Sequence, residues 1–356
     1  MQRTDAVCIQ AAAAHSLNQD LRSLAALGWS DFFTPQLGPD DTGYTQMRIA
    51  TVHRTRMTAE SEAGPVKLTL PSQTSTTDFA VGDWVLIEPQ TSMLVRRLER
   101  RTLLQRRIAG ARTQQLIAAN VDTLFIVTSC NDDFNPARLE RYLALANEAG
   151  ITPVIVLTKA DQVAGVAHYQ EQAEALQSGL DVVSLNAKTH RAVTTLAPWC
   201  GSGQTVALVG SSGVGKSTLL NTLAAKAPEE VQPMGDIREN DAKGRHTTTS
   251  RSLHAIEGGG WVIDTPGMRT LHVSDVAAGL NILFAEISEL APKCRFRDCT
   301  HAHEPGCAVQ AAVAAGMLDP ARLDRWRKLR EEDRENTPSG SGSRGNKPPK
   351  ARVKRR

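Results

Sequence analysis

The stretch from Gly210 to Thr218 constrains this chain more than any other. It begins with the spacing G-x-x-x-x-G-K-S, which is typical of a phosphate-binding loop. A short apolar run at 206–209 precedes it and a helical pattern at 217–225 follows it, which predicts a strand, a loop and a helix in that order. In such a loop the backbone N–H groups and the N-terminus of the helix converge on an anion. The sequence therefore predicts a nucleotide site.

We expect each part of this loop to have its own role. Gly213 and Gly215 let the backbone curl around the phosphates, Lys216 reaches the β and γ phosphates, and Ser217 places its hydroxyl on Mg²⁺. The competing interpretation, a turn without a ligand, does not explain the full spacing between a strand and a helix. The predicted nucleotide-binding residues of the loop are Gly210, Ser211, Ser212, Gly213, Val214, Gly215, Lys216, Ser217 and Thr218.

Composition indicates a globular protein. The chain has 356 residues, of which 41% are hydrophobic and 22% charged, enough for two or three domains. No apolar run approaches the roughly twenty residues of a membrane span, and Asp5 follows the N-terminus without a signal-peptide core. We therefore expect a cytoplasmic protein without a membrane partner. Six cysteines are too few for a disulfide scaffold in so long a chain.

The charge is unevenly distributed along the chain. Residues 336–356 hold seven Lys and Arg and no Asp or Glu, so the net charge of +3 covers a body with 34 basic and 38 acidic residues. A second basic run, between 96 and 112, contains seven arginines and a single acid, Glu99. Separated basic segments favour a polyanionic partner, most directly nucleic acid. A solvated charged face is the alternative for the arginine run.

The patterning predicts a multidomain α/β protein. Short strand-like segments at 47–53, 66–70, 84–88 and 93–98 suit a small β-barrel of the OB type, a fold that commonly binds oligonucleotides. Beyond residue 121 strands alternate with helices, which predicts a parallel sheet with binding loops at the carboxyl ends of its strands. The predicted segments are an N-terminal extension at 1–44, the barrel at 45–112, the nucleotide domain at 113–276, a metal-binding module with a helix at 277–335, and a disordered basic tail at 336–356.

Two motifs at the ends of predicted strands indicate which base is bound. Thr158-Lys-Ala-Asp161 resembles N-K-x-D, in which the carboxylate, here that of Asp161, accepts hydrogen bonds from both guanine N1–H and the guanine amino group. Lys159 would lie along the base. In the second motif, Asn186, Ala187 and Lys188 would close over the O6 edge. Thr158 replaces the usual Asn and Asn186 the usual Ser, and we expect these departures to tune guanine binding rather than abolish it.

A D-x-x-G motif after a further apolar strand points to phosphate-dependent switching. Asp264 can hold Mg²⁺ through water, and the Gly267 backbone N–H can contact the γ-phosphate. Upstream, Thr247, Thr248 and Thr249 are candidates for the threonine that closes on Mg²⁺, and the sequence does not decide among them. Met268 stands where many GTPases have the Gln that orients water, so intrinsic hydrolysis should be slow.

Near the C-terminal end, a Cys/His cluster matches a closed tetrahedral zinc site. Cys294, Cys299 and Cys307 supply three thiolates, and the imidazole comes from His301 or His303, which the spacing leaves open. Four ligands leave no open position, so the zinc would be structural rather than catalytic. Within the same segment, residues 295–297 (Arg-Phe-Arg) suit RNA contact, with simple surface charge as the alternative.

The order of these motifs is that of circularly permuted GTPases, because both base motifs precede the phosphate loop. With the preceding barrel and the following Cys/His cluster, the chain closely resembles the ribosome small-subunit-dependent GTPase A family, also called RsgA or YjeQ, over about residues 45–330. The resemblance implies GTP hydrolysis stimulated by the small ribosomal subunit and a role in late subunit maturation, with GTP or GDP, Mg²⁺ and one structural Zn²⁺ bound. It favours His301 as the fourth zinc ligand. It also suggests His246 as the catalytic group that positions water, alongside Lys216 and Gly267; a purely structural role in the loop is the alternative for His246.

Two other classes of function compete with this interpretation. A small-molecule kinase or ATPase would use the same loop but leaves the base motifs and the basic segments unexplained. A non-enzymatic RNA-binding chaperone would keep a degenerate nucleotide site. We expect a monomeric GTPase that binds the small subunit and its rRNA. The permutation places Asp264 near the C-terminal end of the nucleotide domain. If the γ-phosphate orders the segment around Asp264, this change could move the next module directly.

Overall fold

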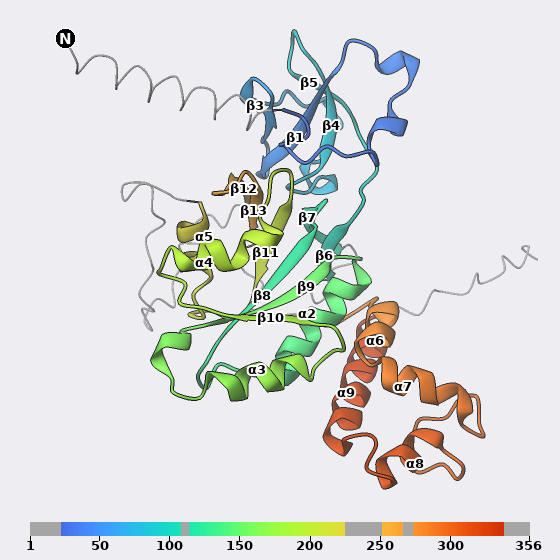
Figure 1. Cartoon of the computed structure of the whole chain (residues 1–356). Coiled ribbons are helices and arrows are strands. Elements are labelled where there is room, and N and C mark those ends of the chain that lie inside the picture. The colour runs from blue at the N-terminus through green and yellow to red at the C-terminus, as the bar shows by residue number, and fades with distance from the viewer. Residues whose placement is uncertain (1–22, 108–113, 225–250, 266–272, 338–356) are drawn as a thin grey trace, which may run out of the picture.

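The computed structural model describes residues 23–107, 114–224, 251–265 and 273–337. Figure 1 shows a group of strands from the N-terminal region at the top, a central sheet with helices on both faces, and a set of helices from the C-terminal region at the lower right. The mixed α/β architecture predicted from the sequence is confirmed. Among the helices of the described ranges, none has the length and apolar character that crossing a membrane would require.

The N-terminal group has five antiparallel strands. They are β1 (Thr45–Val52), β2 (Met57–Ser61), β3 (Gly64–Lys67), β4 (Trp84–Glu88) and β5 (Met93–Arg97). Strand β1 pairs with β2 and β4, β2 pairs with β3, and β4 pairs with β5. An isolated parallel bridge between Thr69 and Met93 joins the segment after β3 to β5. The sequence prediction missed β2, whose Met-Thr-Ala-Glu-Ser pattern carries few β-branched or aromatic residues.

The central strands follow the order β10-β9-β8-β11-β13-β12, and they form one sheet with the N-terminal group because β12 pairs antiparallel with β1. The central strands are β8 (Thr123–Ser129), β9 (Thr152–Thr158), β10 (Asp181–Ser184), β11 (Thr205–Val209), β12 (Ser252–Ala255) and β13 (Trp261–Asp264). All neighbours are parallel except β12, which runs antiparallel to β13. The chain winds outward from β8 to β10 and then returns to β11 on the other side of β8. Ligands bind at the carboxyl edge of such sheets where the strand order reverses, here between β8 and β11.

Both faces of this sheet are buried. Leu124 and Ile126 of β8 pack in one core with α2 (Pro136–Glu148) and α3 (Val166–Glu174). Phe125 and Val127, which alternate with them, pack in a second core with α4 (Arg191–Leu196) and α5 (Lys216–Leu223). Figure 1 shows the two pairs of helices on opposite faces. Burial on both faces explains why these strands are continuous apolar runs.

A two-stranded hairpin lies between the strand group and the central sheet. It consists of β6 (Leu103–Arg107) and β7 (Gln114–Ala119), and it spans the domain boundary predicted at residue 112. The arginine run that precedes and enters it is not a free basic patch, because four of its arginines are paired with aspartates from distant parts of the chain. These ion pairs are Arg96–Asp41, Arg100–Asp83, Arg101–Asp122 and Arg107–Asp275. The arginine run is visible in the sequence, but the aspartates that pair with it are identified only in the folded structure.

The described part of the N-terminal extension packs against both the strand group and the central sheet. Leu27 and Phe33 are each 1% exposed, and the indole of Trp261 in β13 donates a hydrogen bond to the Ala26 carbonyl (2.7 Å). The buried side chain of Arg48, in β1, donates hydrogen bonds to the carbonyl groups of Leu27 and Asn120 and to the Thr205 hydroxyl at the start of β11. Burial lowers the pKa of Arg48 to about 10, so the guanidinium stays charged at neutral pH.

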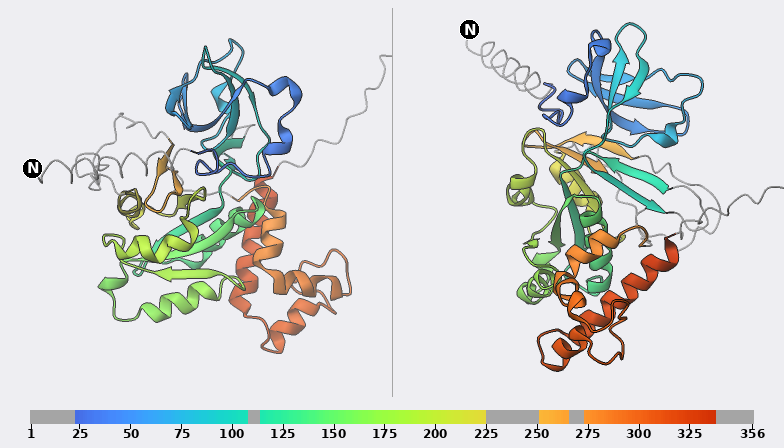
Figure 2. Two further views of the ribbon diagram at one scale, coloured as in Figure 1. Left: turned by 45° about the horizontal axis from the view of Figure 1, so that its top comes forward. Right: turned by 90° about the vertical axis from the view of Figure 1, so that its right-hand side faces the viewer.

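The C-terminal helices are α6 (Ala277–Leu283), α7 (Ala285–Leu290), α8 (Ala308–Ala314) and α9 (Pro320–Asn336). Of these, α6 and α9 contact α2, and Figure 2 shows the C-terminal helices gathered at one side of the central sheet. A Cβ on Gly279 would lie 2.1 Å from the Ala144 carbonyl oxygen, so only glycine permits this approach of α6 to α2. Helices α6 and α7 are separated at Phe284, whose φ of −114° and ψ of 50° are not helical. The side chain of Asp319 caps the start of α9 by accepting a hydrogen bond from the Ala321 N–H.

Candidate nucleotide site and metal centre

The predicted strand, loop and helix around Gly210 to Thr218 are confirmed as β11, the loop and α5. Gly210, Gly213 and Gly215 have φ angles of 140°, 78° and 99°, a region that L side chains rarely adopt. A Cβ on Gly210 would also lie 2.1 Å from the Val127 carbonyl oxygen of β8. The loop therefore needs glycine both for its curvature and for its close approach to the neighbouring strand.

The Lys216 side chain folds back over this loop. Its ammonium group donates hydrogen bonds to the carbonyl oxygens of Gly210, at 2.8 Å, and of Ser211. Ser217 is exposed in the first turn of α5, where the backbone N–H groups have no intrahelical acceptor. A positive side chain and the positive end of a helix thus converge on one side of the loop, an arrangement suited to binding phosphate.

The first base motif is hydrogen-bonded to the phosphate loop. The Thr158 hydroxyl, at the end of β9, lies 2.5 Å from the Val214 carbonyl oxygen in the loop and 3.1 Å from the Thr128 carbonyl oxygen in β8. After it, Lys159 has a left-handed backbone (φ 56°) and turns the chain so that Asp161 is exposed at the same edge of the sheet. The Thr158 hydroxyl therefore connects the end of β9 to the loop.

The second base motif contacts the helix that follows the loop. The Thr222 hydroxyl of α5 donates a hydrogen bond to the Ala187 carbonyl (2.7 Å), and the Asn186 side chain accepts one from the Lys188 backbone N–H (2.9 Å). Thr222 lies within a helical pattern, so the sequence contains no signal that its hydroxyl contacts the Ala187 carbonyl.

The Thr158 hydroxyl should matter for nucleotide affinity. We expect Thr158→Val to weaken GDP binding about tenfold, because the loop carbonyl of Val214 then loses its hydrogen-bond partner and the loop loses its anchor to β9. Thr158→Ser keeps the hydroxyl and should bind as the wild type does. Titration with a fluorescent GDP analogue, with thermal melts to verify folding, measures the difference. Equal affinities of the Val and Ser variants would contradict the anchoring role.

The D-x-x-G aspartate also lies at this edge. Asp264 ends β13 and is in parallel register with Leu208 of β11, and the Thr265 hydroxyl donates a hydrogen bond to the Leu208 carbonyl. The side chain after Asp264 is thus fixed beside the strand that leads into the phosphate loop. The remaining predicted residues of the site, His246, Thr247, Thr248, Thr249 and Gly267, lie outside the described residues.

The Cys/His cluster forms a compact set of ligand atoms. Those of Cys294, Cys299, His301 and Cys307 all lie within 4.8 Å of one another. The Cys294 and Cys307 sulfurs are 3.8 Å apart, and His301 Nδ1 lies 3.5 and 3.4 Å from them. Tetrahedral zinc ligands would be about 3.8 Å apart for two sulfurs and about 3.6 Å for sulfur and nitrogen. These distances and donor types are therefore compatible with a zinc site.

The surroundings select His301 over His303 within this cluster. His301 is 2% exposed and packs against the Trp326 ring of α9, whereas His303 is exposed. Burial, with a contribution from the Arg330 charge, lowers the pKa of His301 and favours the neutral ring that binds metals. Glu304, which the sequence analysis did not single out, accepts hydrogen bonds from the backbone N–H groups of Thr300, Ala302 and His303 and shapes the loop.

A phosphate loop at the reversal point of a parallel sheet, with the base-motif strands earlier in the chain, defines a circularly permuted P-loop GTPase. Solved structures agree. YjeQ from Thermotoga maritima superposes with a TM-score of 0.59 at 26% identity, covering 81% of this chain and 98% of that one. YloQ, described as a circularly permuted GTPase, has a TM-score of 0.57 at 23% identity and covers 85% and 99%, a likeness of fold.

Comparison of sequences narrows the class to a family. The model described as RsgA GTPase matches residues 97–274. The small ribosomal subunit biogenesis GTPase RsgA of Mesorhizobium japonicum is 65% identical over 334 residues, covering 94% of this chain and 96% of that protein. The small ribosomal subunit biogenesis GTPase RsgA 2 of Vibrio vulnificus is 49% identical, with coverages of 88% and 89%. The chain belongs to the RsgA GTPase family, which confirms the resemblance drawn from its motifs.

Proposed function

We propose that this protein hydrolyses GTP during biogenesis of the small ribosomal subunit, and that binding to the subunit accelerates turnover. The small ribosomal subunit is proposed as the partner because the relatives are named small ribosomal subunit biogenesis GTPases. The observation that supports the enzymatic part is the hydrogen bond from the Thr158 hydroxyl to the Val214 carbonyl, which joins the proposed guanine motif to the proposed phosphate loop.

The chain's own groups have distinct roles in this proposal. Asp161 selects guanine, with Lys159 and residues 186–188 around the base, and the loop amides and Lys216 stabilise the charge on the transferred phosphoryl group during in-line attack by water. Ser217 and Asp264 would hold Mg²⁺, which when bound neutralises charge on the β and γ phosphates. From the sequence alone, we assign His246 to positioning the attacking water, Gly267 to the γ-phosphate, and one of the threonines at 247–249 to closing on Mg²⁺.

We propose that Cys294, Cys299, His301 and Cys307 hold one structural Zn²⁺, whose bonds would crosslink a segment with little core of its own.

This module also offers a surface suited to RNA. The Phe296 ring is 41% exposed with the Arg295 guanidinium 5.5 Å from its centre, and Arg297 is exposed beside it. An unstacked base can pack on such a ring while the guanidinium groups bind phosphate.

The N-terminal strand group is proposed as an OB-type barrel that contacts rRNA. Support comes from its antiparallel pairing and from the bridge between Thr69 and Met93, which brings the segment after β3 to β5. The proposed domains remain the barrel at 45–112, the GTPase domain at 113–276 and the zinc module at 277–335.

The test is phosphate release from GTP with and without purified small ribosomal subunits. We expect stimulation of at least about tenfold by small subunits, little by large subunits, and no competition from ATP. These expectations follow from a site with Met268 in place of the water-orienting Gln and with Asp161 at the base. Preferential ATP use would favour a kinase or ATPase, and the absence of stimulation would remove the proposed partner.

A further inference from the structure

The last turns of α9 hold the segment 273–276, which we call the exit segment. This segment follows Asp264 closely in the chain and leads into α6. The Val273 N–H donates to Glu332 Oε1 (3.1 Å), and the Val276 N–H donates to Asp333 Oδ1 (3.0 Å). Four hydrogen bonds in all join the exit segment to α9, the other two running from Asp275 N–H to the Thr337 hydroxyl (2.8 Å) and from the Asn336 amide to the Val273 carbonyl (3.0 Å).

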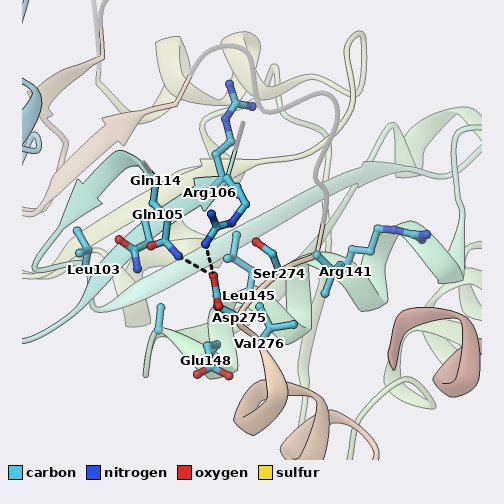
Figure 3. Close-up of a pocket in the computed structure, with 13 residues that line it drawn as sticks. Leu103, Gln105, Arg106, Gln114, Arg141, Leu145, Glu148, Ser274, Asp275 and Val276 are labelled. Carbon is cyan, nitrogen blue, oxygen red and sulfur yellow. Dashed lines mark hydrogen bonds and ion pairs between the residues drawn. The ribbon is translucent and has the colours of Figure 1, made fainter. Parts of the chain in front are cut away.

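The hairpin holds the exit segment from the other side. Asp275, whose backbone is left-handed (φ 56°), accepts hydrogen bonds from Arg107 (3.0 Å) and Gln114 (2.8 Å). Figure 3 shows Gln114 and Asp275 beside a cavity that lies among the hairpin, α2 and the exit segment. The volume of this cavity is about 170 Å³. The exit segment is therefore fixed between a strand pair and a helix of the C-terminal module.

Glu332 connects this contact to the nucleotide domain. While Oε1 accepts from Val273, its second oxygen, Oε2, lies 2.7 Å from Arg141 Nη2 and 3.2 Å from Arg141 Nε. Arg141 belongs to α2, and α2 follows directly from β8, whose carboxyl end lies beside the phosphate loop. A single carboxylate thus joins α9, α2 and the exit segment.

The other end of α9 contacts the metal cluster. Trp326 packs against the His301 ring at 5.3 Å between centroids, and Arg322 and Arg325 form ion pairs with Glu140 of α2, whose side chain is fully buried. A helix of 17 residues is about 25 Å long. The same helix therefore contacts both the metal cluster and the exit segment.

On this geometry, we infer that α9 transmits subunit binding at the metal-bearing module to the nucleotide site, with Glu332 as the positioning residue for the exit segment. The inference rests on the proposed function, since it explains how the subunit stimulates hydrolysis. Two sites coupled through one element typically change each other's affinity or rate by 5- to 150-fold. Loss of Glu332 should remove most of this coupling without changing the groups that contact the nucleotide.

The experiment compares Glu332→Ala with Glu331→Ala in the full-length protein. Glu331 is the adjacent carboxylate, but it forms only an exposed ion pair with Arg334, so it is a matched control. For Glu332→Ala we expect basal hydrolysis, zinc content and subunit affinity within about twofold of the wild type, and stimulation by subunits reduced about tenfold. Glu332→Gln can still accept from Val273 N–H and should recover part of the stimulation. Asn336→Ala removes the hydrogen bond to the Val273 carbonyl and should also reduce the stimulation by subunits.

The outcomes separate this inference from the proposed function. A stimulated wild type with undiminished stimulation in Glu332→Ala and Asn336→Ala would overturn the inference and leave the function standing. Loss of basal activity and subunit affinity together in Glu332→Ala would indicate a structural role and would also overturn it. A wild type that subunits do not stimulate would refute both.

Discussion

Replacing Lys216 with alanine is expected to lower subunit-stimulated GTP hydrolysis by about a thousandfold. The ammonium group bonds to the Gly210 and Ser211 carbonyls and so lies over the loop where the phosphates would bind. Removing one preorganised charge from a phosphoryl-transfer site commonly costs two to three orders of magnitude or more in rate. Phosphate release under saturating subunits measures the effect.

The matched control is Lys67→Ala, which removes an exposed lysine at the edge of the N-terminal strand group. It should keep the wild-type rate, and both variants should keep the wild-type melting temperature to within a few degrees. Equal phosphate release by Lys216→Ala and the wild type would indicate that the measured turnover does not occur at this loop. The non-enzymatic RNA chaperone would then be the better description.

The second large effect is expected from Cys307→Ser. Cys307 is both a member of the metal cluster and the cap of α8, where its sulfur accepts from the Gln310 N–H. Loss of a structural zinc can remove on the order of 10 kcal/mol of binding free energy that otherwise stabilises the fold. We expect the variant to lose its zinc, to melt around the cluster and to lose subunit binding. Guanine nucleotide binding should remain, because the base motifs and the phosphate loop belong to the central sheet.

Metal analysis, proteolysis and subunit sedimentation measure these changes. Cys130→Ser is the control, since Cys130 is a buried thiol of the central domain outside the cluster and should keep one zinc per chain. Full zinc content and intact subunit binding in Cys307→Ser would show that the four residues are not a structural metal site.

The motifs and much of the secondary structure could be predicted because their signals are local. The strand, loop and helix around Gly210 follow from consecutive residues, and the limits of α2 follow from Asn135 as a cap and Pro136 in the first turn. Where local signals were weak, the prediction failed: β2 was missed because it lacks β-rich residues.

By itself the sequence determined the family, through the order of the motifs, and the chemical types gathered around Lys216 and the cysteines. Only the tertiary structure decided which groups meet. It paired four arginines of the run with aspartates from other parts of the chain. It also brought the Thr158 hydroxyl to the Val214 carbonyl, buried His301 and left His303 exposed, and placed Glu332 between α2 and the exit segment. The physical reason is that a motif is fixed by neighbours along the chain, whereas a hydrogen bond or ion pair depends on how close folding brings two residues that the sequence separates.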